Sequence, residues 1–408
     1  MRGDQRAGAS RCRIRKYRSG DLEALLRVHQ VSGEEALHQS WYYLENPRVD
    51  LDLVYVIEFA GEARSTARIV PLQLYVDGKV VPVGGIATVA THPAYRRRGL
   101  AGRLTRHALY ELRGRGVHLS LLHPFDPAFY RRYGFELATE GLSYTLKLAD
   151  LPASSERHRV RGYSGGDLPE MMALQDEEAA LHPCCVRRSE SWWRLALDLS
   201  GEKAADYGHR AAVYEREGRL EGYVLYRHSE AGRDRAPRRV LHVPELLTRT
   251  PEARSGLHSF LAAHAPLASE LEYEASRADP LHPFLDTALP EARAEPGFML
   301  RLVDVEGALG LLEREIEAPL SLEVSDDTIP ENRGEYTVGT TGEVLGGASS
   351  AERVALDVRQ LARLYAGSVS ASQLARHGLV LPGSAKALEL LEALFPRADP
   401  WIFPIDSF

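Results

Sequence analysis

Residues 92–103, HPAYRRRGLAGR, place three consecutive arginines and two glycines directly after a run of apolar residues. The apolar run, 85–91, predicts a strand, and LAGRLTRHALYELRGRG predicts an amphipathic helix. Small residues between a strand and a helix let the backbone approach a ligand closely, and amides at a helix N-terminus attract anions. This segment therefore predicts a pyrophosphate-binding loop. A solvated loop and a nucleic-acid surface are the alternatives.

Two common phosphate-binding motifs do not match this loop. The Gly-Lys-Ser/Thr end of a Walker loop is absent, and the glycine spacing differs from the dinucleotide fingerprint. The 408 residues exceed one compact core, so we expect two or three domains. The formal net charge of -7 argues against broad nucleic-acid binding and is compatible with a cationic substrate.

The cysteines and the chain ends add expectations about metal, membrane and compartment. Cys12, Cys184 and Cys185 have neither metal-ligand spacing nor a disulfide pattern, so we expect no metal. No apolar run is long enough to span a bilayer, and residues 1–11 are basic without a following apolar stretch. We interpret 1–11 as a disordered tail and expect a cytoplasmic protein without membrane contact.

The sequence divides into three regions of mixed α/β character. Residues 12–151 predict a strand, a helix, a three-stranded antiparallel segment with an Asp77-Gly78 hairpin turn, and the arginine loop. Residues 156–310 repeat this order, but PEARSGL at 251–257 replaces the arginine loop, so we interpret this copy as degenerate. Residues 319–408 predict a small α+β domain, including a helix through the apolar positions Val354, Val358, Leu361 and Tyr365.

Two motifs together resemble the GNAT acetyltransferase superfamily. The loop fits [Gln/Arg]-x-x-Gly-x-[Gly/Ala], and Phe129-Tyr130-Arg-Arg-Tyr-Gly134-Phe135 follows some thirty residues later. The resemblance implies that the loop amides hold the pyrophosphate of acetyl-CoA and that the preceding strand pairs with its pantetheine arm. It implies these cofactor contacts: Val89, Ala90, Thr91, Arg96, Arg97, Arg98, Gly99, Leu100, Ala101, Gly102, Phe125 and Asp126.

The resemblance also implies that Tyr130 is the general acid that protonates the leaving thiolate. A phenol with an ordinary pKa of about 10 is reasonably matched to a thiol of about 8.5. The alternative is that Tyr130 only packs beneath the cofactor.

The whole chain resembles the Eis (enhanced intracellular survival) family within this superfamily. An intact GNAT domain, a degenerate GNAT domain and a sterol-carrier-protein-like domain follow one another there, and VPVGGIATVATHPAYRRRGL, QLARLYAG and WIFPIDSF support the match. In that family the last carboxylate of the chain enters the first domain as general base, which implies the α-carboxylate of Phe408. An α-carboxylate is a weak base, with an ordinary pKa of about 3.5. A buried aromatic tail with a solvated carboxylate is the alternative.

The resemblance implies an N-acetyltransferase acting on an amine of a cationic small molecule (an aminoglycoside, a polyamine or a lysine-like amine) and a homo-oligomer, by resemblance a hexamer. Ser407 precedes Phe408 where an acidic residue would help to bind a cation, and Asp406 is one position earlier. Glu34, Glu35 and Trp41 are candidate lining residues. The alternative function is a non-catalytic carrier built on a decayed acetyltransferase scaffold.

Overall fold

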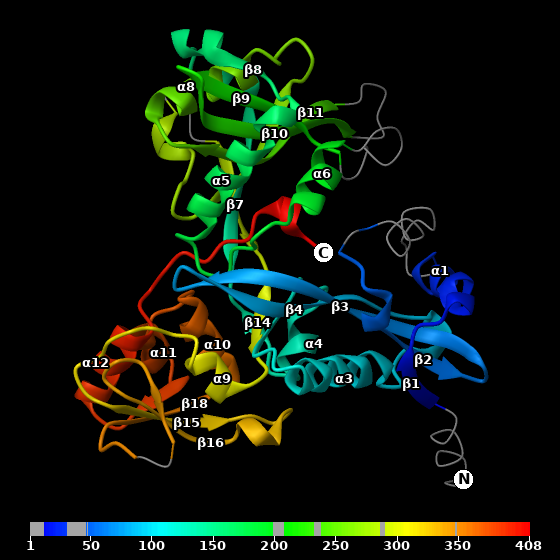
Figure 1. Cartoon of the computed structure of the whole chain (residues 1–408), viewed down its shortest axis with the longest axis vertical. Helices are drawn as coiled ribbons and strands as arrows, with labels where there is room; N and C mark the ends of the chain where they lie inside the picture. Colours follow the sequence, from blue (N-terminus) through cyan, green and yellow to red (C-terminus); the bar gives the residue numbers. More distant parts are fainter. Residues whose placement is uncertain are drawn as a thin grey trace.

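The computed structural model describes residues 12–30, 46, 48–198, 208–231, 238–285, 290–346 and 349–408. The predicted tail 1–11 and the candidate lining residues Glu34, Glu35 and Trp41 lie outside the described residues. The described residues form a mixed α/β structure with two seven-stranded sheets and one five-stranded sheet. Figure 1 shows one unit around each sheet, and the end of the chain lies between the first two units.

The first sheet has the strand order β1-β2-β3-β4-β5-β14-β6. Its hairpin between β3 and β4 turns at Asp77 and Gly78, which both have positive φ (47° and 74°), so the predicted turn is confirmed. The strand that leads into the arginine loop begins at Lys79, six residues earlier than the predicted 85. The elements of this unit are β1 Cys12–Lys16, α1 Leu22–Gln30, β2 Val54–Phe59, β3 Glu62–Val76, β4 Lys79–Thr91, α3 Leu100–Gly114, β5 Leu119–Leu122, α4 Pro127–Arg131 and β6 Glu136–Leu137.

The second sheet has the order β13-β7-β12-β11-β10-β9-β8, and it exchanges a strand with the first. β7 comes from the range 12–151 but pairs with β12, whereas β14 comes from the range 156–310 but lies between β5 and β6. Neither range therefore supplies a complete sheet alone. The elements here are β7 Glu140–Lys147, β8 Val160–Gly162, α5 Leu168–Ala179, α6 Glu190–Asp198, β9 Arg210–Arg216, β10 Arg219–Ala231, β11 Arg238–Thr248, α8 Pro251–Ala262, β12 Glu270–Ser276, β13 Glu291–Pro296 and β14 Met299–Leu302.

The third sheet has the order β17-β16-β15-β18-β19 and is covered by helices. The predicted helix through Val354 is wrong at its start, because Arg353–Asp357 form strand β18, parallel to β15. The Asp357 carboxylate accepts a hydrogen bond from the Arg359 amide and caps the helix that follows. The elements are α9 Val305–Leu309, β15 Leu320–Ser325, β16 Gly334–Val338, β17 Val344–Leu345, α10 Val358–Ala366, α11 Ala371–Arg376, β19 Val380–Pro382 and α12 Ala385–Leu394.

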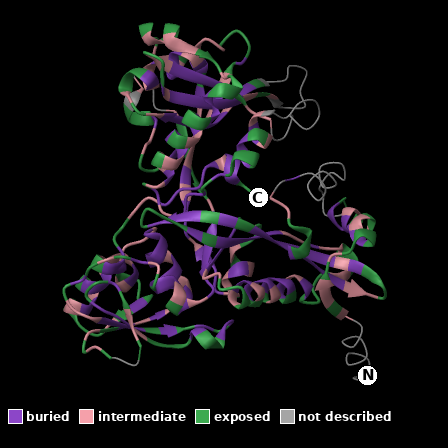
Figure 2. Cartoon of the chain, viewed as in Figure 1, coloured by how far each residue is buried: buried purple, intermediate pink, exposed green. Residues whose placement is uncertain are grey.

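One apolar core joins the first and third units. It runs from β3, β4, β5 and β14 to α10, α11 and α12, and Figure 2 shows the buried residues concentrated along these elements. After α12 the chain leaves the third unit, passes along the second, and ends in a turn of 3-10 helix, Pro404–Asp406, followed by two residues. The fold thus brings the last residues of the chain to the first sheet.

Candidate active site

The first sheet opens where β4 separates from its parallel neighbour β5, and this opening between the two strands is called the cleft below. The two strands pair only from Val83 with Leu119 to Gly85 with Leu121, although β4 continues to Thr91. Beyond Gly85 the edge of β4 therefore has no pairing with β5. This separation leaves backbone amides of β4 available to an extended ligand.

A β-bulge lies inside the separated part of β4. Thr66 pairs with Ala90 and Arg68 pairs with Ala87, so Thr88 and Val89 together oppose one residue of β3. Thr88 has a φ of 47°, which is costly for a β-branched residue. The bulge redirects the backbone at Val89, one of the predicted contacts. Ala90 and Thr91 lie between this bulge and the loop.

The arginine loop follows a turn of 3-10 helix, Pro93–Tyr95. Its three arginines are exposed; Arg96 donates to the Thr91 carbonyl at 3.1 Å, and Arg98 lies 5.2 Å from the ring of Tyr95. Arg97 and Gly99 both have positive φ (60° and 74°), so the backbone turns sharply before the helix. The predicted loop conformation thus presents positive charge at the start of α3.

The N-terminus of α3 faces this loop without a side-chain cap. Gly99 occupies the N-cap position and offers no side chain to the first amides of the helix, at Leu100, Ala101 and Gly102. A Cβ on Gly99 would meet no atom within 4 Å, so the space before the helix is open. At Gly102 a Cβ would overlap the Tyr133 side chain, so that glycine also allows close packing.

The second unit has no equivalent loop. β11 ends at Thr248 and α8 begins at Pro251, so the residues Pro251 to Gly256, which the sequence analysis assigned to a loop, belong to a helix. The Thr250 hydroxyl accepts a hydrogen bond from the Ala253 amide and caps that helix. At this position the second unit thus has a capped helix in place of the loop and the open helix N-terminus of the first.

Tyr130 lies on α4 within an aromatic cluster. Its side chain is buried, and its ring contacts those of Phe125, Phe129 and Phe135 at centroid distances of 5.3, 4.9 and 6.1 Å. Burial raises the pKa of the Tyr130 phenol above its ordinary value, so the hydroxyl keeps its proton. The pKa values of the Tyr130 phenol and the leaving thiol are therefore less closely matched than their ordinary values imply.

Two residues near Tyr130, Phe125 and Asp126, were also predicted to contact acetyl-CoA, and their surroundings differ. Phe125 is 67% exposed and covers the cluster from the solvent side. The Asp126 carboxylate accepts a hydrogen bond from the Ala128 amide at 2.9 Å and caps α4. Asp126 therefore has a structural partner that accounts for its position.

Phe408 reaches the cleft at the point where β4 and β5 separate. A Cβ on Gly85 would lie 2.4 Å from the Phe408 ring, whereas a Cβ on neighbouring Gly84 would meet Leu112 of α3 at 2.2 Å. The two glycines therefore allow close packing on opposite faces of β4. The Phe408 ring also contacts Phe298 at a centroid distance of 5.3 Å.

Sequence reasoning missed several residues around this end of the chain. His123 follows β5, contacts Phe298 at a centroid distance of 5.3 Å, and has a pKa lowered by burial. Arg48 donates to the backbone carbonyls of Asp406 and Ser407 at 3.2 and 2.8 Å. His123 could have been found from the sequence, because it directly follows a predicted strand. The Arg48 contacts could not, because they join residues more than 350 positions apart.

Asp406 does not face the cleft. Its side chain is fully buried and pairs with Arg188 of the second unit, with 2.7 Å between Nε and Oδ1. It is therefore unavailable to a cationic ligand, although the sequence analysis noted it as the nearest acid to the chain end.

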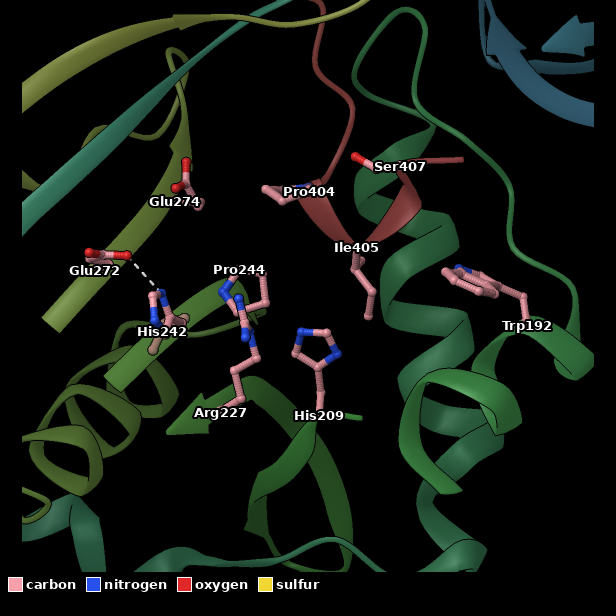
Figure 3. A pocket seen from close by; sticks show the side chains of 11 residues that line it. Trp192, His209, Arg227, His242, Pro244, Glu272, Glu274, Pro404, Ile405 and Ser407 are labelled. Atoms are coloured by element: carbon pink, nitrogen blue, oxygen red, sulfur yellow. Dashed lines mark ion pairs between the residues drawn. The ribbon is translucent and has the colours of Figure 1, made fainter. Parts of the chain in front are cut away.

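A cavity of about 280 Å³ lies beside the chain end, between the second sheet and residues 404–407. Figure 3 shows Glu272 and Glu274 of β12 on one side and Trp192 of α6 on the other. His242 Nδ1 lies 2.7 Å from a carboxylate oxygen of Glu272, burial lowers the pKa of His242, and burial raises the pKa of Glu274. The cavity thus combines carboxylates with an aromatic wall.

Within the described ranges, no three His, Cys, Asp or Glu side chains are grouped closely enough to hold a metal ion. None of the helices described there is both long and apolar enough to cross a membrane.

Comparison with known families assigns a description to each unit. Residues 13–138 and 184–302 each match a family described as acetyltransferase (GNAT) domain. Residues 305–403 match a sterol carrier protein domain.

Relatives span most of the chain. An uncharacterized N-acetyltransferase of Streptomyces avermitilis is 29% identical over 84% of this chain and 85% of its own. N-acetyltransferase Eis of Mycobacterium tuberculosis is 27% identical over 83% of this chain and 85% of its own. Among solved structures, a GCN5-related N-acetyltransferase from Anabaena variabilis has a TM-score of 0.84 at 23% identity, covering 98% of this chain and all of that one. Eis1 from Mycobacterium abscessus has a TM-score of 0.73 at 24% identity, covering 97% and 100%.

Proposed function

Because the chain is an Eis-like N-acetyltransferase with two GNAT domains and a sterol carrier protein domain, we propose that it transfers the acetyl group of acetyl-CoA to an amine of a cationic small molecule. The observation that carries this proposal is the position of Phe408, whose ring packs on Gly85 where β4 and β5 separate. We propose that the strand amides of β4, the Tyr130 phenol and the terminal carboxylate of Phe408 act together in one site. A non-catalytic carrier would not require that combination.

The first unit has the features that acetyl-CoA requires. The exposed Arg96, Arg97 and Arg98 and the open N-terminus of α3 suit a pyrophosphate. The unpaired edge of β4 suits the amides of a pantetheine arm. We assign to the backbone N–H at the Val89 bulge the polarisation of the thioester carbonyl, which would stabilise the oxyanion as the amine attacks.

The reaction needs two proton movements, which we assign to the two ends of the cleft. The amine nitrogen forms a bond to the thioester carbon and the carbon–sulfur bond breaks, so a proton leaves the nitrogen and the sulfur gains one. We assign the first proton to the Phe408 carboxylate, directly or through water, and the second to the Tyr130 hydroxyl. Since burial raises the Tyr130 pKa, its main effect would be hydrogen bonding to the developing thiolate.

The cavity beside the chain end supports a cationic acceptor. Glu272 and Glu274 line the same cavity as Ser407, whereas the Asp406 carboxylate is buried and paired with Arg188. A second amine of a polyamine or aminoglycoside would be attracted there while the first reaches Phe408. Glu272→Gln combined with Glu274→Gln should therefore raise KM for a di- or polyamine more than for a monoamine.

Acetyl-CoA-dependent thiol release across aminoglycosides, polyamines and lysine peptides tests the proposal. Turnover with any of them supports it. Deleting Phe408 should abolish turnover while acetyl-CoA binding, followed by calorimetry, stays intact. Appending one glycine after Phe408 keeps the ring but moves the carboxylate, so it should be equally inactive, whereas Phe408→Leu should retain activity. Unchanged turnover after the deletion would remove the base assignment, and absence of acetyl-CoA binding would favour a carrier.

A further inference from the structure

The second unit contains a gap that corresponds to the cleft of the first. β11 pairs with parallel β12 only as far as Val243 with Tyr273, yet β11 continues to Thr248. In the same way, β4 leaves β5 after Gly85. Each copy of the fold thus opens its sheet at the same place in the strand order.

The C-terminal tail, residues 399–408, runs along the gap in the second unit. Trp401 and Phe403 line a small cavity there together with residues of β11 and β12, and both side chains are buried. A Cβ on Gly141 of β7 would overlap the Trp401 ring, so this strand also accommodates the tail closely. The Cys185 thiol donates to the Trp401 carbonyl at 2.8 Å. The tail is thus packed into the fold along this stretch.

A buried ion cluster holds the next residues of the tail. Arg188 donates from Nε and Nη2 to the two carboxylate oxygens of Asp406 at 2.7 and 2.9 Å. It also donates to both oxygens of Glu245 on β11, at 2.8 and 2.5 Å. Trp192 donates its indole N–H to Asp406 at 3.3 Å, and the Tyr223 hydroxyl donates to Glu245 at 2.5 Å.

This cluster fixes geometry because all its charges are buried. The side chains of Arg188, Glu245 and Asp406 are each 0% exposed. Although burial acts to lower it, the two carboxylates raise the pKa of Arg188 well above its ordinary value, so the guanidinium stays charged. A planar guanidinium bonded to two carboxylates at once permits one orientation of each partner. Movement of Asp406 would leave charge unpaired away from water.

We propose that the second GNAT domain acts as a receptor for the C-terminal tail, in which the Arg188–Asp406 pair positions Phe408 in the cleft of the first domain. Only Ser407 separates the clamped residue from Phe408, so the carboxylate can move little relative to Asp406. Arg48 also donates hydrogen bonds to the backbone carbonyls of Asp406 and Ser407. This inference rests on the proposed function, since it explains how the proposed base reaches its place. Arg188 and Asp406 are positioning residues.

Asp406→Ala and Asp406→Asn test the proposal, because Arg188 remains paired with Glu245 in both variants. Asp167→Asn is the matched control: Asp167 forms an equally bidentate pair with Arg161, at 2.8 Å for each bond, in the same domain but away from the tail. Two readouts are needed for each full-length variant. One is kcat and KM for acetyl-CoA. The other is the rate at which a carboxypeptidase releases Phe408 from the native protein.

The expected result separates positioning from general stability. Asp406→Ala should release Phe408 at least about tenfold faster and lower kcat by about 10²-fold, with KM for acetyl-CoA unchanged. Asp406→Asn should change the rate of Phe408 release and kcat by less than Asp406→Ala does. Asp167→Asn should change neither. Unchanged release of Phe408 in Asp406→Ala would overturn the receptor assignment. Faster release with unchanged kcat would overturn the positioning role, and the Phe408 deletion then shows separately whether the base assignment also fails.

Discussion

At the scale of single residues, Gly85 decides whether the chain end can reach the cleft. The Phe408 ring occupies the space that any larger side chain at this position would need. Gly84 makes the same allowance for Leu112 on the other face of β4. Gly85 therefore allows the tail to pack on β4, and Gly84 allows α3 to pack on the other face of the same strand.

Gly85→Ala should displace the Phe408 ring without closing the loop that we assign to acetyl-CoA. We expect kcat to fall by about 10²-fold, because small misplacements of a reacting group have effects of this size. KM for acetyl-CoA should change little. Steady-state kinetics measure both constants. Gly84→Ala is the control: it should lower the thermal unfolding midpoint, since Leu112 belongs to the core. An equal loss of kcat in both variants would contradict the assignment of Gly85 to the tail and of Gly84 to the core.

A second residue, His258, links the stability of the second domain to pH. Its ring is 4% exposed, and burial first and Arg254 second lower its pKa from an ordinary 6.5 to about 4. The unfolded chain binds a proton between these values and the folded chain does not, so stability falls as pH drops from 6.5 towards 4. The difference corresponds to about 3 kcal/mol.

His258→Leu should therefore flatten the acid side of the stability profile. At pH 7 we expect little loss, because Nε2 of His258 has no hydrogen-bond partner within the described part of the chain. Unfolding midpoints in urea between pH 4 and pH 8 measure the effect. If the stability of the variant falls as steeply between pH 6.5 and pH 4 as that of the wild type, other groups cause the acid sensitivity.

At the scale of elements, the loop before α3 differs from its counterpart before α8. Both helices follow a strand that leaves its parallel neighbour, but α3 begins behind a glycine whereas α8 begins behind the capping Thr250. An open helix N-terminus attracts an anion because its first backbone N–H groups have no acceptor. In a capped helix, the capping side chain already accepts one of these hydrogen bonds. This difference is local, and it distinguishes the site-bearing copy from the other.

Gly99→Ala should weaken acetyl-CoA binding by strain alone. The added Cβ meets no atom, but the φ of 74° costs a non-glycine residue about 1 kcal/mol or more. We expect Kd for acetyl-CoA to rise by roughly tenfold, a factor equivalent to 1.4 kcal/mol. Gly116→Ala at the far end of α3 is the matched control, since its φ is 70° and its surroundings are equally open. Calorimetric titration should show an unchanged Kd in that control.

The loop and α4 could be predicted from the sequence because short-range patterns determine them. Arg96 to Gly99 and Phe129 to Gly134 lie in the predicted elements, and Gly134 has the positive φ of 81° that its position after α4 requires. The helix predicted through Val354 is wrong only in its first residues, where the apolar spacing suits both a helix and a strand. The tertiary pairing of β18 with β15 decided it.

At the scale of the whole molecule, the C-terminal tail touches both copies of the fold. Trp401 and Phe403 lie along the gap of the second unit, and Phe408 lies at the cleft of the first. No local pattern could predict these contacts, because Arg188 and Asp406 are 218 positions apart. The strand exchange by β7 and β14 was hidden for the same reason. The homo-oligomer, by resemblance a hexamer, stays a prediction that light scattering can test.

The exchanged strands imply that residues 12–151 cannot fold alone. That fragment holds the predicted acetyl-CoA contacts and Tyr130 but lacks β14, which pairs with both β5 and β6. Its β7 would also lose β12 and β13 and expose an unpaired strand. We expect the fragment to aggregate, or to give an amide NMR spectrum without dispersion.

Co-expression of 12–151 with 152–408 provides the control, because each piece supplies the strand that the other lacks. A soluble one-to-one complex that binds acetyl-CoA is the expected result, with turnover restored because Phe408 is present. Size-exclusion chromatography and thiol release measure the two properties. If 12–151 instead folds alone with well-dispersed amide signals, β14 is dispensable to the first sheet, and the two domains are more independent than their strand exchange implies.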